Sequence, residues 1–308
     1  STQNDLVLFA VDRTLNTPTN EVWGYRFFNQ GQKRIQSAWF KWELPNNIIF
    51  HTIMDDVYYA VLNTGSTYTL EKFDIRLSPT TMLVGTDPDT NRIHLDTKKT
   101  FASSALTYDI GTNVTTFTLG AGFYSTNTLT AYIKATGDQQ GRSYDIPDTS
   151  ITGSHPNKVV TLPGNWKNYV NDAGATITTD IIIGYEYEFE VELPKVYVTR
   201  QQGEKIRSET RGSLVIHRMN FDFGDVGVID VTLKRRGRND YTKTYESLEW
   251  DSVTSNTAAI ADGYTHTVPV YDRNTNLTVH LKSNHPSPAT LHSMNWEGDY
   301  SNKFYRSV

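Results

Sequence analysis

The sequence predicts an all-β protein, and three observations support this prediction. Apolar residues recur at every second position through most of the chain, which is the period of a strand. The apolar runs are rich in Thr, Val, Ile, Tyr, Phe and Trp, the residue types that favour strands. Gly, Asn, Asp and Pro separate the runs as turn residues do. With 308 residues, the chain is long enough for two or three domains, each with its own core.

Residues 1–78 are predicted to form the end of a β-propeller. A hairpin pattern that begins at Asp5 recurs about 50 residues later at Asp56, and such a period is typical of four-stranded propeller blades. A β-sandwich with two similar hairpins is the alternative. Because the chain begins with Ser and a strand follows almost at once, we expect it to be a portion of a longer product. The strands expected here are Leu6–Val11, Glu21–Phe28, Ile35–Leu44, Ile48–Ile53, Val57–Leu62 and Tyr68–Ile75.

Residues 79–180 are predicted to form an inserted β-rich domain with one short helix. Pro79, Gly85 and Pro88 mark the boundary, and the strands that follow are shorter and richer in Thr and Gly. Expected strands include Val114–Leu119 and Leu129–Lys134.

The expected helix lies near the end of this domain and is only two turns long. Its apolar residues have helical spacing, a side chain suited to an N-cap precedes them, and a glycine follows them. These positions are Asn165 as the cap, Trp166, Tyr169, Val170 and Ala173 as the apolar face, and Gly174 as the stop.

Residues 181–308 are predicted to form a β-sandwich-like domain, because strong alternation returns and several strands follow one another at short spacing. The expected strands are Ile181–Leu193, Ser213–Phe221, Gly227–Lys234, Thr265–Val270, Leu277–Ser283 and His292–Tyr300.

Composition excludes several classes of function. The chain has no Cys, so disulfides, thiol nucleophiles and Cys-ligated metals are absent. A net charge of −5 is unsuited to a protein that clamps DNA over its whole surface. No apolar run reaches the length of a membrane span. No nucleophile elbow, phosphate loop or dinucleotide motif occurs, and the His residues lack metal-binding spacing. We therefore expect no cofactor and no metal.

The carboxylates that resemble catalytic or calcium-binding groups are better interpreted as turn residues. The segment that starts at Asp87 begins like a calcium loop, but Arg92 and Lys98 occupy the positions that need Gly and Glu. Asp55 and Asp56 are adjacent, and on a strand they would point to opposite faces rather than flank one glycosidic bond. We expect no catalytic residues.

One segment places four carboxylates in a row. On a continuous strand, Glu186, Glu188, Glu190 and Glu192 would share one face, opposite Tyr185, Tyr187, Phe189, Val191 and Leu193. Four ionised carboxylates cannot be buried without partners. They are expected either on a solvated face or on an acidic surface that prevents a polyanion from adhering.

A basic hairpin tip is the counterpart of this row. Lys234, Arg235, Arg236 and Arg238 surround a Gly in a turn sequence. Such a tip is expected to be solvated, to contact phosphates, or to contact an acidic neighbouring subunit. No aromatic residues are interleaved with the cations, so binding of single-stranded nucleic acid is not supported.

The order of several segments along the chain resembles a phage tail family. These segments lie at residues 36–44, 56–61, 70–74, 183–189, 211–218, 224–227 and 296–300. They are similar to the C-terminal portion of tail tubular protein B, the nozzle protein of T7-like podophages. The resemblance is weak in the middle of the chain, which is consistent with a variable insertion.

The resemblance implies a structural component of the virion tail, made in the cytoplasm of the bacterial host and without catalytic residues. It implies a hexamer in the intact tail, with the adaptor (tail tubular protein A) and the tail fibre as partners. It also implies a conduit through which double-stranded DNA passes without sequence recognition. The alternatives are a glycan hydrolase, or a module that binds an envelope glycan or receptor through residues 79–180.

Overall fold

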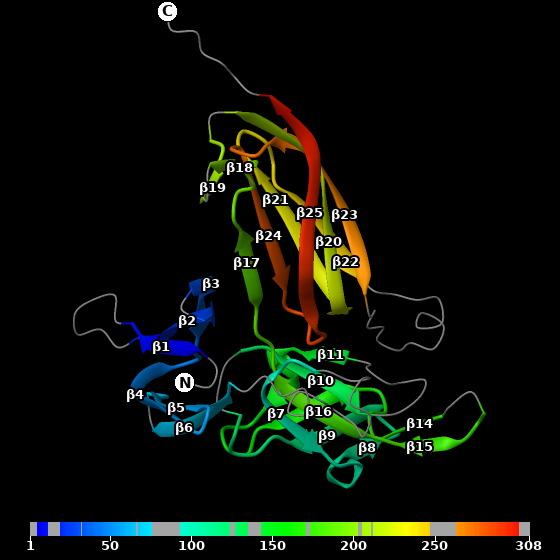
Figure 1. Ribbon diagram of the computed structural model, residues 1–308. Coiled ribbons are helices and arrows are strands. Elements are labelled where there is room, and N and C mark those ends of the chain that lie inside the picture. Colours follow the sequence, from blue (N-terminus) through cyan, green and yellow to red (C-terminus); the bar gives the residue numbers. More distant parts are fainter. Residues whose placement is uncertain are drawn as a thin grey trace, which may run out of the picture. The chain divides into compact units, whose positions relative to one another are not determined.

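The computed structural model shows an all-β chain, as predicted (Figure 1). It describes residues 5–11, 19–31, 33–65, 67–75, 93–123, 127–134, 143–170, 173–202, 205–210, 212–246 and 263–301. In these ranges the helical elements are two short 3-10 turns, Ser103–Ala105 and Asp148–Ser150, and no helix has the length and apolar character needed to cross a membrane. The chain divides into two compact units, one of Ser1–Thr81 with Phe123–Asn127 and one of Met82–Gly122 with Thr128–Val308.

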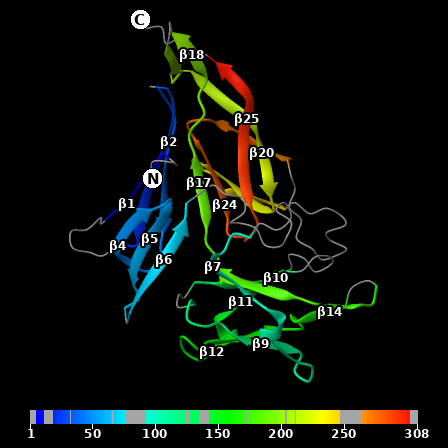
Figure 2. The ribbon, with the colours of Figure 1, turned by 60° about the horizontal axis from the view of Figure 1, so that its bottom comes forward.

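The first unit contains two antiparallel sheets of three strands, which share one core (Figure 2, blue strands). Val22 and Leu44 from one sheet region pack with Tyr58, Ala60 and Leu62 of the other. No closed ring of sheets occurs among the described residues, so the propeller remains a prediction. The strands are β1 (Leu6–Ala10), β2 (Glu21–Gln30) and β3 (Lys33–Glu43), then β4 (Asn47–Met54), β5 (Val57–Asn63) and β6 (Tyr68–Asp74).

The second unit begins with two four-stranded sheets, ordered β11-β10-β16-β7 and β12-β13-β9-β8, and a hairpin of β14 and β15. Ile181, Ile182 and Ile183 of β16 are all buried, because this strand lies inside its sheet and is covered on both faces. The strands are β7 (Asp96–Phe101), β8 (Thr107–Asp109), β9 (Val114–Thr118), β10 (Leu129–Lys134), β11 (Ser143–Ile146), β12 (Ile151–Thr152), β13 (Val159–Pro163), β14 (Asn168–Val170), β15 (Thr176–Thr178) and β16 (Asp180–Tyr185).

The predicted helix after Asn165 is wrong. The Asn165 side chain does accept hydrogen bonds from the backbone N–H groups of Lys167 (3.1 Å) and Asn168 (2.9 Å), as an N-cap would. The chain then enters β14, which pairs with β15. Trp166 is buried and donates its indole N–H to the Pro163 carbonyl at 2.8 Å. This anchor and the hairpin pairing outweigh the weak tendency of a two-turn segment to become helical.

The second unit ends with two sheets that share a core, ordered β17-β24-β21-β22 and β23-β20-β25, and a small hairpin of β18 and β19 (Figure 1). Alternate residues of β21, namely Ile229, Val231 and Leu233, are buried. The strands are β17 (Phe189–Leu193), β18 (Thr199–Gln202), β19 (Lys205–Ser208), β20 (Ser213–Val226), β21 (Val228–Arg235), β22 (Tyr241–Glu246), β23 (Tyr264–Arg273), β24 (Leu277–Ser283) and β25 (Ala289–Ser301).

The predicted continuous strand Ile181–Leu193 is interrupted. β16 ends at Tyr185 and pairs with β10 and β7, whereas β17 begins at Phe189 and pairs with β24. The alternating pattern continues across the break because residues 186–188 join two strands that belong to different sheets. Local periodicity cannot reveal such a change of partner, since both strands have the same period.

The imidazole of His266, on β23, is buried next to the core that the last two sheets of the second unit share. Its ring lies 4.0 Å from the ring of Tyr245 and 4.4 Å from that of Tyr264, measured between centroids. Its Nε2 atom is buried without a hydrogen-bond partner. Burial, followed by the charge of Lys243, lowers the pKa of His266 to about 4. The native state therefore holds this side chain neutral.

We expect the free energy of unfolding to fall as the pH is lowered from about 6.5 to about 4, because the unfolded chain binds a proton at His266 that the native chain rejects. Each pKa unit is worth about 1.4 kcal/mol, and partial solvation should reduce the total to about 2 kcal/mol. Urea unfolding at several pH values measures this loss. In His266→Phe, the same pH interval should show a loss smaller by that amount; an unchanged pH profile would contradict the assignment.

Candidate functional site

The predicted acidic row is divided between two places. Glu190 and Glu192 lie on β17, and Glu188 directly precedes this strand. Glu186 instead follows β16, where its backbone N–H donates to the Thr128 carbonyl at 2.9 Å. The prediction that all four share one strand face is therefore wrong, because the chain changes sheets between Tyr185 and Phe189.

The three carboxylates at β17 have basic partners on the neighbouring strand β24. His280 lies between two of them, with Nδ1 at 2.9 Å from Glu190 Oε1 and Nε2 at 3.6 Å from Glu192 Oε2. Lys282 Nζ lies 2.6 Å from Glu188 Oε2. The hydrogen bond to His280 lowers the pKa of Glu190, and the hydrogen bond to Glu188 raises the pKa of Lys282. Each charge is thus stabilised by its neighbour.

The rest of this sheet face is polar rather than uniformly acidic. On β21 and β22 the Thr232 and Thr242 hydroxyls lie 2.9 Å apart, and Thr244 donates to Asp230. We name the face that carries Glu188, Glu190, Glu192, His280 and Lys282 the compensated face. Its carboxylates are solvated and ion-paired, which satisfies the requirement that they not be buried alone.

Glu186 lies beside a second carboxylate at the buried hydroxyl of Thr130. Thr130 Oγ1 is 2.5 Å from Glu186 Oε1 and 3.3 Å from Asp145 Oδ1. One hydroxyl has one proton, so it cannot donate fully to two ionised carboxylates. Burial is the main cause that raises the pKa of Glu186, and the nearby Asp145 raises it further against the opposing hydrogen bond from Thr130.

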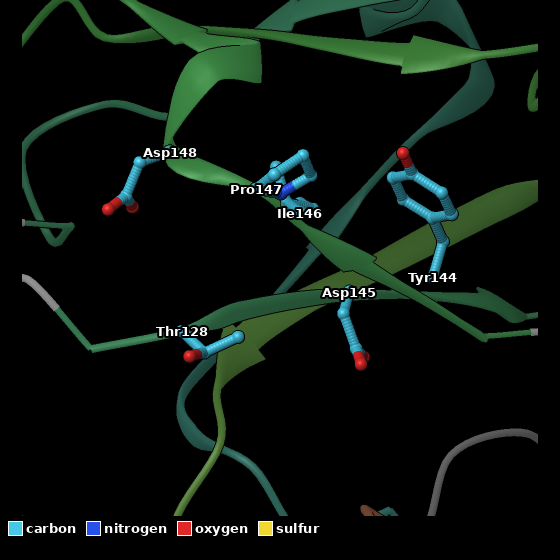
Figure 3. Close-up of a pocket in the computed structure, with 6 residues that line it drawn as sticks. All are labelled: Thr128, Tyr144, Asp145, Ile146, Pro147 and Asp148. Atoms are coloured by element: carbon cyan, nitrogen blue, oxygen red, sulfur yellow. The ribbon is translucent and has the colours of Figure 1, made fainter.

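A pocket of about 370 Å³ lies next to this pair (Figure 3). Its walls include Tyr144, Asp145 and Asp148, together with Thr128, Ile146 and Pro147. The hydroxyl of Thr130 joins Asp145 to Glu186. The pocket offers carboxylates and one aromatic ring.

The other predicted acidic sites have no metal or catalytic geometry in the described part of the chain. Asp55 and Asp56 form the turn between β4 and β5, both with positive φ (48° and 58°), as in a type I′ hairpin turn. The loop that begins at Asp87 lies outside the described residues. Within the described ranges, no group of three or more His, Asp or Glu side chains is placed to hold a metal ion.

The basic residues do form a hairpin tip. β21 ends at Arg235, Gly237 has a positive φ of 78°, and β22 begins at Tyr241. A neighbouring turn holds the backbone of the tip. The Arg236 N–H donates to the carbonyl of Asn276, in the turn between β23 and β24, at 3.0 Å. Lys234, Arg236 and Arg238 are exposed.

Sequence reasoning missed an exposed aromatic surface on the first unit. Trp39 is 61 % exposed and Phe9 is 44 % exposed, and their stacked rings lie 6.2 Å apart. The Tyr25 ring lies 4.6 Å from that of Trp39. We name these three residues, with Val7 beside them in register, the aromatic face. The sequence contains a signal for this surface, because apolar residues occupy both odd and even positions in β2 and β3. Such a pattern indicates a strand that is covered on both faces.

The other sheet of the first unit also exposes apolar side chains. Phe50, Val61 and Leu70 lie directly opposite one another across β4, β5 and β6. Phe50 is 60 % exposed and Leu70 is 69 % exposed. Both outer faces of this unit thus have the apolar character of surfaces that are covered by another molecule or domain.

Comparison with known proteins identifies one family. The sequence model described as bacteriophage nozzle protein matches residues 1–307. No curated protein matches the sequence. Among solved structures, the chain is similar to dimeric latent PorU from Porphyromonas gingivalis (9 % identity, TM-score 0.17, 68 % of this chain and 24 % of that one). It is also similar to an uncharacterized protein from Listeria monocytogenes (11 % identity, TM-score 0.15, 93 % and 28 %). The chain spans about a quarter of the length of each, and these low scores support no conclusion.

The Glu186 site yields a stability prediction. Because the native pKa of this carboxyl is raised, its ionisation costs stability as the pH rises above about 4.5, the usual value for Glu. We expect Glu186→Gln to raise the urea midpoint at pH 7 and to have little effect at pH 4, where the wild-type carboxyl is protonated. Glu192→Gln, on the exposed face, is the control and should show no such gain at pH 7. A lower midpoint for Glu186→Gln at pH 7 would refute the raised pKa.

Proposed function

The chain belongs to the bacteriophage nozzle protein family, and we propose that it forms part of the wall of the tail conduit through which double-stranded DNA leaves the particle. Family membership makes it a structural protein of the phage tail. The proposal adds a ring of identical subunits, six in the intact tail, that meets the adaptor protein and the tail fibre. The match over residues 1–307 is the observation that carries it.

The architecture supports a mechanical role. Antiparallel sheets hold their backbone by hydrogen bonds between strands, and long pairings such as β20 with β25 extend these contacts over most of both strands. Within the described residues, no group of three or more His, Asp or Glu side chains is placed to hold a metal ion. A wall needs rigidity, which paired antiparallel strands supply.

The first unit is proposed to be the end of a propeller, packed on both sides. Propeller blades stack face to face, so each blade needs two apolar faces. The aromatic face and the Phe50–Val61–Leu70 row provide them. Their proposed occupants are further β-sheets of the nozzle.

The compensated face is proposed to line the conduit. Its carboxylates outnumber its cations and small hydroxyls lie beside them, so DNA phosphates should not adhere strongly to this surface. In this form the acidic-lumen hypothesis is limited to Glu188, Glu190 and Glu192, since Glu186 lies elsewhere.

Glycan binding is the second candidate, and the pocket beside Tyr144 is what favours it. Aromatic rings stack on sugars and carboxylates accept their hydroxyl protons. Retention of the purified chain on envelope glycans, without release of reducing ends, would favour this alternative over the hydrolase and would assign the pocket to host recognition.

We expect Trp39→Ser combined with Phe9→Ser to reduce the yield of infectious particles by at least about tenfold, because both side chains are exposed in the isolated chain and would be buried in the assembled nozzle. The isolated variant should unfold at nearly the same urea concentration as the wild type. Tyr271→Ser, which removes an equally exposed ring (69 %) from the second unit, is the control. Normal particle yield from the double variant would contradict packing of this face.

The lumen assignment predicts an effect of charge on ejection. Glu190→Gln with Glu192→Gln leaves His280 and Lys282 without part of their compensation, so the face becomes more basic and should retain DNA. We expect ejection from intact particles to slow several-fold at low ionic strength and to recover at high salt, where the charges are screened. The control, Asp148→Asn with Asp299→Asn, removes as much charge elsewhere. An ejection rate equal to that of the wild type at low salt would exclude the lumen role.

A further inference from the structure

Cations from three segments gather at one end of the sandwich in the second unit. The Arg236 N–H donates to the Asn276 carbonyl, and the Asn276 N–H donates to the Arg273 carbonyl, both at 3.0 Å. Lys195 Nζ donates to the Thr275 carbonyl at 2.9 Å, so the segment after β17 joins the same turn. We name this cluster the basic end; its members are Lys195, Lys234, Arg235, Arg236, Arg238 and Arg273.

The described guanidinium groups of the basic end differ from other cationic positions in having no ion pair with a carboxylate, whereas the hydrogen bond of His280 and the charge of Lys234 both act on Glu190 and lower its pKa. On the sheet faces Arg218 pairs with Glu297 at 2.6 Å, and Lys282 pairs with Glu188 at the same distance. Among the described residues, no ion pair involves the guanidinium groups of the basic end. Asp240 and Asp272 lie in the same segments, yet the cations outnumber them. Among the described residues, a chain of net charge −5 thus gathers an excess of cations at this end.

Hydrogen bonds restrain the backbone of this tip, and one of its guanidinium groups is partly buried. Arg235 is partly buried, and its Nε atom is buried without a hydrogen-bond partner. The tip backbone is fixed by the Asn276 contact and by the Arg238 N–H, which donates to the Arg235 carbonyl at 3.1 Å. A restrained turn loses little conformational freedom when its side chains meet an anion.

We propose that the basic end contacts the phosphodiester backbone of double-stranded DNA. The inference rests on the proposed function, because a duplex must pass the chain for this end to meet it. Guanidinium groups match phosphate oxygens in bidentate geometry. An acidic partner subunit is the less favoured occupant, because the carboxylates of the compensated face are already paired. Single strands are disfavoured too, since residues 234–240 contain no aromatic side chain.

Such contacts are independent of base sequence and weaken with salt. Each phosphate contact adds about −0.9 to the slope of log affinity against log salt concentration. A few contacts therefore hold DNA weakly at physiological salt, which is compatible with a duplex that must move past. The basic end would guide the duplex, while the compensated face would let it slide.

Fluorescence anisotropy of a labelled 20-bp duplex with the purified 308-residue chain, titrated from low to physiological NaCl, tests this assignment. Arg236→Gln with Arg238→Gln should make the salt slope shallower by up to about 1.8. The matched control is Arg218→Gln with Lys282→Gln, which removes two ion-paired cations and should leave the slope unchanged. Equal slopes for the wild type and the tip variant, or an equal loss in the control, would overturn the proposal.

Two further measurements distinguish duplex DNA from a membrane surface and from a second subunit as the partner of the basic end. Vesicles that contain phosphatidylglycerol should compete less well than duplex of equal phosphate concentration; tip-dependent binding that favours vesicles would assign the end to a membrane instead. Sedimentation should show no tip-dependent self-association; oligomers lost in the tip variant would assign it to a subunit contact. These measurements use the isolated chain, whereas the tail role is tested by particle yield and ejection, so failure here and failure of the proposed tail role remain distinguishable.

Discussion

This structure depends on the two-residue period of a β-strand, because successive side chains point to opposite faces of a sheet. When the side chains of one face are buried in a core, those of the other face still need partners or solvent. In the sandwich, polar side chains on the outer face of the β23-β20-β25 sheet form hydrogen bonds with one another across the strands. Thr265 and Ser293 both donate to Asp222, at 2.8 and 2.6 Å, from the strands on either side. A parallel row joins Thr267, Asn220 and Asn295. Such a face needs no partner.

The first unit solves the same constraint differently. Its strands bury Val22 and Leu62 between the two sheets but leave Trp39 and Leu70 outside. The free energy of covering these side chains is available for assembly rather than for folding of the chain alone. This contrast between a self-sufficient sandwich and a sheet pair with two apolar outer faces is the physical basis for proposing that the first unit mediates assembly.

Charge follows a similar division. Along the faces, carboxylates and cations neutralise one another, as Glu188 and Lys282 do. Among the described residues, the guanidinium groups of the basic end form no such pair. Where Glu186 and Asp145 share the hydroxyl of Thr130, burial is the main cause that raises the pKa of Glu186. Each arrangement meets the same rule, that a charge must be solvated, paired or neutralised, by a different route.

The sequence by itself determined the all-β class, most strand positions, the tip formed by Lys234–Arg238 and the family resemblance, because alternation, turn residues and segment order are local properties. Only the tertiary structure decided which strands are neighbours. It divided 181–193 between two sheets and so separated Glu186 from Glu190, and it drew Trp166 into a hairpin anchor in place of a helix. It also brought the turn at Asn276 into hydrogen-bond contact with Arg236, from a distant segment. Pairing between strands depends on contacts remote in sequence, and a period of two is the same whichever partner a strand has.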